Sequence, residues 1–78
     1  MSQESFGGRI VADPDIRHGR PVIAGTRLPV ETILGSLAGG MTIDEVCKEY
    51  DIDREDVFAV LEYARESVAG EEIRSLPA

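Results

Sequence analysis

Few side chains in this sequence could do covalent chemistry, and they are far apart. Ser67 and Cys47 are candidate nucleophiles, but the chain holds one histidine, His18, in a different predicted element. A hydroxyl or thiol nucleophile needs an adjacent base, and one cysteine with one histidine is not a metal-ligand set. The carboxylates of the second and third predicted helices fall mostly on outward faces, whereas an acid–base pair needs burial to separate its pKa values. We therefore predict no enzymatic activity, metal or cofactor.

Basic side chains concentrate at the start of the chain. Residues 1–30 carry four arginines against three acids, a net charge of +1, and residues 31–78 carry four basic residues against twelve acids, a net charge of −8. Contact with a polyanion should therefore begin in the first third. Within it, a glycine-containing loop supplies the predicted nucleic-acid contacts, Arg17, His18 and Arg20.

A tight turn follows this loop at Gly25, Thr26 and Arg27. Glycine between two residues with side chains suggests a turn position with positive φ. We predict that these three residues are structural. For Arg27 we favour a role in bracing a carboxylate across a dimer interface.

The outward face of the third predicted helix is acidic, which is unfavourable beside DNA. A carboxylate about 6 Å from a phosphate is repelled by roughly 0.7 kcal/mol even at the dielectric of bulk water. A basic protein would instead be attracted to this face. The predicted partner-binding residues are Glu62, Tyr63 and Glu66 on the helix, with Ile73 and Leu76 in the tail. The acidity also suits a halophile proteome, and both explanations stay open.

The pattern of apolar, glycine and proline residues predicts a mainly α fold. Residues 1–8 are expected to be disordered and residues 71–78 to form a flexible tail, leaving a single domain at 9–70. Short strands are expected at 9–12, 22–23 and 27–28. Helices are expected at 29–38, 43–49 and 54–68, with Pro29 at the first helical position.

The second and third predicted helices begin with the same capping pattern. Thr42 and Asp53 are predicted N-caps, each with an acidic residue three positions on, Glu45 and Asp56. A short helix, a tight turn and a longer helix give the outline of a helix-turn-helix, of winged-helix or homeodomain type. The expected core face of the third helix consists of Val57, Val60, Leu61, Ala64 and Val68, with Ala59 outward.

The chain of 78 residues has a modest core, because 42% of its residues are apolar and only four are aromatic. Strands of two or three residues are too short to be stable alone. We therefore predict a homodimer in which the β segments pair between chains. No stretch is long and apolar enough to span a bilayer, and no signal-peptide pattern is present, so we expect a cytoplasmic protein without a membrane partner.

The segment Gly19–Val30, GRPVIAGTRLPV, holds an unusual series of residues in a fixed order. It resembles the signature of domain-of-unknown-function family 433, small prokaryotic helix-turn-helix proteins, and the resemblance runs on to about Ala64. This similarity implies a VapB-type, antitoxin-like protein whose operon neighbour is a PIN-like ribonuclease toxin. The expected function is to bind and neutralise that toxin and to repress the shared operon, with operator DNA as a further partner. The alternatives are a DNA-binding regulator without a toxin and a purely structural interaction domain.

Overall fold

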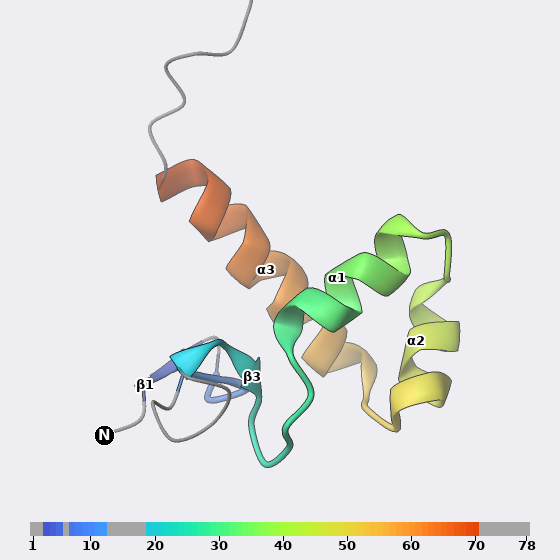
Figure 1. The fold of residues 1–78 in the computed structure, drawn as a ribbon, viewed down its shortest axis with the longest axis horizontal. Coiled ribbons are helices and arrows are strands. Elements are labelled where there is room, and N and C mark those ends of the chain that lie inside the picture. Colours follow the sequence, from blue (N-terminus) through green and yellow to red (C-terminus); the bar gives the residue numbers. More distant parts are fainter. Residues whose placement is uncertain (1–2, 6, 13–18, 71–78) are drawn as a thin grey trace, which may run out of the picture.

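The structure, a computed structural model, describes residues 3–5, 7–12 and 19–70. Three short strands precede three helices, as the sequence predicts for a mainly helical domain (Figure 1). The elements are β1 (Gln3–Ser5), β2 (Ile10–Ala12), β3 (Val22–Ile23), α1 (Val30–Ala38), α2 (Ile43–Tyr50) and α3 (Arg54–Gly70).

The three strands form one antiparallel sheet within a single chain, in the order β1-β2-β3. The prediction that residues 1–8 are disordered is therefore wrong for Gln3–Ser5. Because β1 supplies a neighbour for β2, and β2 also contacts α3, the strands do not need a second chain to pair with. The strands thus have partners within their own chain, and the homodimer with pairing between chains stays a prediction.

The predicted strand at residues 27–28 does not form. The Thr26 hydroxyl donates to the Ile23 carbonyl at 2.7 Å and accepts from the Leu28 N–H at 2.9 Å. The side chain thus occupies the backbone groups that a second ladder would use, a known competition between side chain and sheet. Only an isolated bridge between Val22 and Pro29 remains.

The helix boundaries agree closely with those expected from capping residues. Pro29 is the extended N-cap of α1 rather than its first helical residue. A complete capping box between Thr42 and Glu45 begins α2. Asp51 ends α2 in the left-handed conformation at φ 56°. Three residues separate α2 from α3, which gives the helix-turn-helix outline its tight connection.

The core lies where α3 meets α1, α2 and β2 (Figure 1). On α3, Val57 and Val60 are fully buried, as predicted, but Ala59 is buried as well, while Leu61 and Val68 are exposed. The expected core face is wrong at these three positions. Because α3 packs on the sheet as well as on two helices, its buried arc is turned toward the sheet. The buried residues are Ile10, Val22, Ile23, Val30, Ile33, Val46, Val57, Ala59 and Val60.

In the described part of the chain, no helix combines the length and the apolar character needed to cross a membrane.

Candidate functional site

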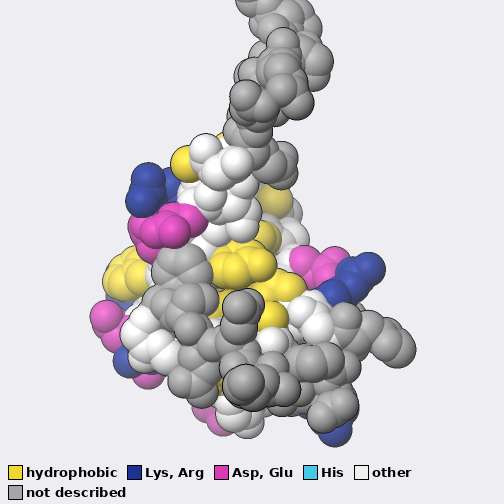
Figure 2. All heavy atoms as spheres, turned by 90° about the vertical axis from the view of Figure 1, so that its left-hand side faces the viewer, with side chains coloured by type: hydrophobic (Ala, Val, Ile, Leu, Met, Phe, Trp, Pro, Cys, Tyr) yellow, Lys and Arg dark blue, Asp and Glu magenta, His cyan; other side chains and the backbone are white. Residues whose placement is uncertain are grey.

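Charges of opposite sign lie side by side on the surface rather than in separate patches. Figure 2 shows acidic and basic side chains next to one another at the edges of one face, with hydrophobic side chains between them. Arg20 contacts Glu31 at 2.8 Å and Arg65 contacts Glu62 at 2.6 Å, and all four side chains are well exposed. Arg54 pairs with Asp44. Most of the basic side chains in the described segments thus face a carboxylate of their own chain.

The predicted nucleic-acid contacts are only partly described. Arg17 and His18 lie outside the described residues, so the structure does not show whether they converge with Arg20. Arg20 is 63% exposed and its ion pair with Glu31 connects the loop before β3 to the first turn of α1. An exposed pair of this kind contributes little to stability. The pair therefore leaves the Arg20 guanidinium open to exchange Glu31 for a phosphate.

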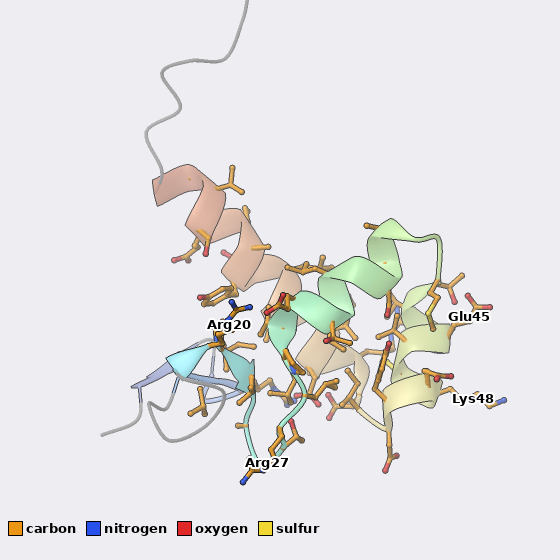
Figure 3. The ribbon with its side chains drawn as sticks, viewed as in Figure 1. Arg20, Arg27, Glu45 and Lys48 are labelled. Atoms are coloured by element: carbon orange, nitrogen blue, oxygen red, sulfur yellow. The ribbon has the colours of Figure 1, made fainter. Side chains whose placement is uncertain are left out.

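Two basic side chains have no ion pair among the residues that the structure describes, Arg27 and Lys48. Figure 3 shows Arg27 at the tip of the loop between β3 and α1, pointing away from the helices, and Lys48 pointing outward from α2. Arg20, Arg27 and Lys48 come from three separate places and do not converge. The described residues therefore do not form a single basic patch. Since Arg27 meets no carboxylate in its own chain, its bracing role across a dimer stays a prediction.

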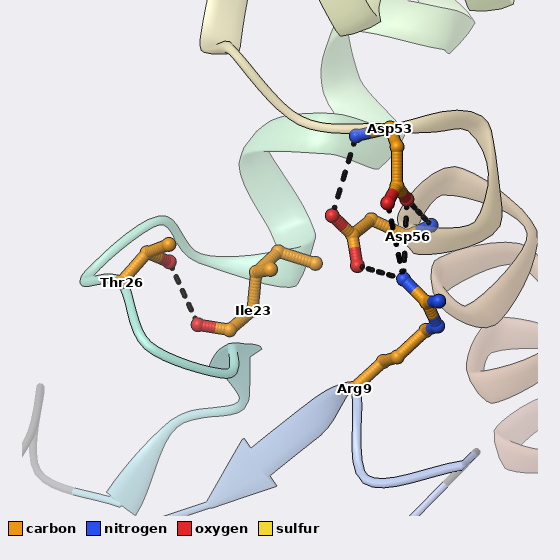
Figure 4. Close-up of polar contacts among 5 residues, drawn as sticks. All are labelled: Arg9, Ile23, Thr26, Asp53 and Asp56. Atoms are coloured by element: carbon orange, nitrogen blue, oxygen red, sulfur yellow. Dashed lines mark hydrogen bonds and ion pairs between the residues drawn. The ribbon is translucent and has the colours of Figure 1, made fainter.

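The turn that presents Arg27 has the geometry expected from sequence. The Thr26 N–H donates to the Ile23 carbonyl at 3.0 Å, and Gly25 has φ +78°. The Thr26 hydroxyl adds its bond to the same carbonyl (Figure 4). Gly25 and Thr26 both fix the shape of this turn, at the positions where the sequence analysis predicts a structural turn.

Arg9 joins the sheet to the helix-turn-helix, a contact that the sequence analysis missed. Its Nη1 lies 3.1 Å from Asp53 Oδ1 and 2.9 Å from Asp56 Oδ1 (Figure 4). The same two aspartates cap α3, because the Asp56 N–H donates to Asp53 Oδ1 and the Asp53 N–H donates to Asp56 Oδ2. We call this group the Arg9 clasp. It takes Arg9 out of the basic surplus of the N-terminal third.

The clasp favours the charged forms of Asp53 and Arg9. The pKa of Asp53 lies below its usual value, first because the Asp56 N–H donates to the carboxylate and then because of the positive charge on Arg9. The pKa of Arg9 is raised, chiefly by its hydrogen bond to Asp56. Arg9 and the aspartates are more than forty residues apart, so no local spacing could have revealed the contact.

The predicted partner-binding residues of α3 do not all share one face. Glu62 and Glu66 flank Arg65, which lies 2.6 Å from Glu62 and 4.0 Å from Glu66. The hydrogen bond from Arg65 lowers the pKa of Glu62. Tyr63, in contrast, is half-buried and packs against the core cluster. It contributes to the fold, so its expected role as an outward anchor does not match its position. Ile73 and Leu76 lie outside the described residues.

The outward apolar residues of α3 are different from those expected. Phe58, Leu61 and Val68 are the large hydrophobic side chains that are exposed within the described segments. The Arg54 guanidinium lies 5.6 Å from the centre of the Phe58 ring. Sequence periodicity placed Leu61 and Val68 in the core, because it assumes a single apolar stripe facing the other helices.

A metal centre is not evident in the part of the chain that is described, where no three His, Cys, Asp or Glu side chains come together to hold an ion. A shallow hollow of about 440 Å³ lies on α2 between Met41, Glu45, Lys48 and Glu49. Its charged side chains are exposed and of mixed sign, so it lacks the buried, convergent polar groups of a small-molecule site.

Comparison with known families and structures gives a family match and a similarity to a solved structure. Residues 10–64 match a family model described as "Protein of unknown function (DUF433)". The X-ray crystal structure of Rv2018 from Mycobacterium tuberculosis is similar to this chain, with a TM-score of 0.63 and 30% sequence identity. The similarity covers 72% of this chain but 27% of that one, so this chain corresponds to a minor part of the larger protein. A search among curated proteins found no match.

Proposed function

We propose that this chain, which belongs to the DUF433 family of proteins of unknown function, is an antitoxin-like module. It binds and neutralises a PIN-like ribonuclease toxin and represses the operon that encodes both. In this proposal α3 carries the surface that meets the toxin, and the N-terminal loop carries the contacts to operator DNA.

The proposal rests on one observation, the pairing of most described basic side chains with carboxylates of the same chain. Of the six basic side chains in the described residues, four are engaged by carboxylates of the same chain. A protein that binds nucleic acid through its helix-turn-helix needs free cations on those helices to displace counterions from DNA. Here α2 and α3 offer only Lys48 without an ion pair. The surface is therefore better suited to a basic protein than to a phosphate backbone.

A ribonuclease is a partner with the required chemistry. It must present basic residues to bind RNA, and those residues attract and orient an acidic partner. On α3, the Glu62 and Glu66 carboxylates share the single positive charge of Arg65, and the exposed Glu55 takes part in none of the ion pairs of the described residues. A negative surface of this kind can cover a ribonuclease active site and exclude RNA.

The direct test is an RNA-cleavage assay with the PIN-like ribonuclease encoded beside this gene. We expect stoichiometric inhibition by the intact chain, with weaker inhibition at physiological salt by a Glu55→Gln, Glu62→Gln, Glu66→Gln variant. The matched control is Glu49→Gln, which removes an exposed carboxylate from α2. Full ribonuclease activity in the presence of a tenfold excess of this protein would refute the proposal.

A second candidate is a DNA-binding regulator without a toxin. It is favoured by the helix-turn-helix outline together with Arg27, which is exposed and without an ion pair in the described structure. Salt-dependent binding to the upstream promoter, without any bound or inhibited ribonuclease, would select this function.

A further inference from the structure

The outward side of α3 carries a line of exposed apolar side chains. Phe58, Leu61 and Val68 are 43%, 39% and 58% exposed, and they are the large hydrophobic residues that reach solvent in the described structure. Isolated apolar residues on a surface are ordinary. These three are not scattered, because all lie on one helix of 17 residues.

Their spacing places them on one face. Positions 58, 61 and 68 are separated by three and seven residues, the spacing of neighbouring side chains along one side of an α-helix. The remaining position of the line is Arg65, whose guanidinium is drawn aside by Glu62. At its start, Arg54 stacks on the Phe58 ring while pairing with Asp44. We call Phe58, Leu61 and Val68 the α3 stripe.

The stripe is unsuited to reading DNA. The second helix of a helix-turn-helix lies in the major groove and reads base edges mainly with hydrogen-bonding side chains. The outward positions of α3 instead offer an aromatic ring, aliphatic groups and the carboxylates Glu55 and Glu62. This composition matches the centre of a protein interface, where aromatic and aliphatic anchors enter pockets of the partner.

The charges beside the stripe indicate the kind of partner. Glu55, Glu62 and Glu66 lie along one flank of the stripe, at intervals of seven and four residues. Together with Asp44, they place four carboxylates around Arg54 and Arg65, a net charge of −2. In a second copy packed antiparallel on the stripe, the acidic flank of one helix would lie beside the acidic flank of the other, where like charges repel. A partner with lysine or arginine beside an apolar pocket has no such conflict.

We propose that the α3 stripe inserts into an apolar pocket on the ribonuclease partner, with cations of that pocket's rim pairing with Glu55, Glu62 and Glu66. This inference rests on the proposed function and identifies the residues that hold the partner. It replaces the half-buried Tyr63 with Leu61 and Val68 as the anchors of the complex.

The experiment measures binding of the neighbouring PIN-like ribonuclease to immobilised full-length chain by surface plasmon resonance. The test variant is Leu61→Lys with Val68→Lys, and Val68→Lys alone serves where the double change disturbs the fold. The matched control is Ser67→Lys, which adds the same side chain to an exposed site about 100° around the helix from Val68. Circular dichroism of each variant verifies the helical fold.

The stripe variants are expected to bind at least about tenfold more weakly, mainly through faster dissociation, while Ser67→Lys binds like the parent. Equal binding by parent and stripe variants would overturn the inference and leave the proposed function standing. If the parent itself does not bind the ribonuclease, both fail together. A parent that forms a dimer which the stripe variants dissociate would likewise overturn the inference, since the second copy would then be the occupant.

Discussion

The turn between β3 and α1 gives a sharp test of the fold. A glycine-to-alanine substitution should destabilise the protein in this turn, whereas the same substitution in α1 should stabilise it. Gly25 has φ +78°, and a Cβ built on it meets no atom within 4 Å. Replacing Gly25 with alanine therefore adds backbone strain without a steric clash. Left-handed geometry costs a residue with a Cβ about 1–2 kcal/mol. For a domain of this size the melting temperature should fall by about 4–16 °C.

The matched control is Gly35→Ala in α1. Gly35 also has open space at its Cβ position, but its backbone is helical. Alanine there should stabilise the protein by roughly 0.5–1 kcal/mol, because glycine is a poor residue for a helix interior. Thermal unfolding followed by circular dichroism at 222 nm measures both. If Gly25→Ala unfolds at or above the parent's melting temperature, the turn does not have the geometry described. The position of Arg27 at the tip of this turn would then also be wrong.

The remaining predictions concern the C-terminal end of α2, the Arg9 clasp and the binding of nucleic acid. Asp51→Gly should raise the melting temperature by an amount equivalent to about 1 kcal/mol, since Asp51 has φ 56° and glycine relieves that strain; thermal unfolding at pH 7 measures the change, and an unaltered or lower temperature contradicts it. The pKa of Asp53 is lowered from 3.8 on folding, so its contribution to stability is present above that value and is lost as the pH falls through the folded pKa. The Asp56 N–H is the first cause of this lowering and the charge of Arg9 a further one, so Arg9→Gln should flatten part of the loss of stability between about pH 5 and pH 2, measured by urea unfolding at each pH; a pH profile that merely shifts downward as a whole would show that Arg9 does not act on the Asp53 carboxylate. If Arg20 and Arg27 contact phosphates, their double alanine variant should reduce the slope of log K against log salt by about two, as measured by fluorescence anisotropy with promoter DNA; an unchanged slope makes both arginines structural.

The features that sequence predicts well are those in which cause and effect lie a few residues apart. Thr42 with Glu45 and Asp53 with Asp56 each form a capping pair within one helical turn, and the structure contains both sets of hydrogen bonds. Gly25 likewise reveals its positive φ through its immediate surroundings. Local hydrogen-bonding and backbone preferences are sufficient at these positions.

The features that sequence missed depend on what α3 packs against. Periodicity alone predicts one apolar stripe that faces the other helices, but β2 also packs against α3. Asp56, Ala59 and Tyr63 are therefore partly or fully buried. The helix face that remains outside then includes Leu61 and Val68. The Arg9 clasp was missed for the same reason, because Arg9 meets Asp53 and Asp56 only once the sheet packs against α3. The candidate binding surface is thus a product of tertiary packing that local pattern cannot supply.

Some of the acidic residues are explained by the stability of the helices. Only the remaining carboxylates can therefore indicate where a partner binds. Glu31, Asp44, Glu45, Glu55 and Asp56 all lie in the first turn of a helix. Carboxylates are favourable there because the helix N-terminus carries partial positive charge and unpaired N–H groups.

That explanation does not extend to Glu62 and Glu66. Both lie well beyond the first turn of α3, Glu62 at its midpoint and Glu66 in its second half, where the helix dipole gives a carboxylate no advantage, and they share the single guanidinium of Arg65. Neither a helix cap nor the buried core accounts for them, yet they lie beside the exposed Leu61 and Val68. If acidity served only the fold or a saline cytoplasm, removing these two charges would leave association with a basic partner unchanged. If they attract that partner, their removal slows association at low salt and leaves the melting temperature unaltered, whereas removal of the first-turn acids destabilises the helices themselves.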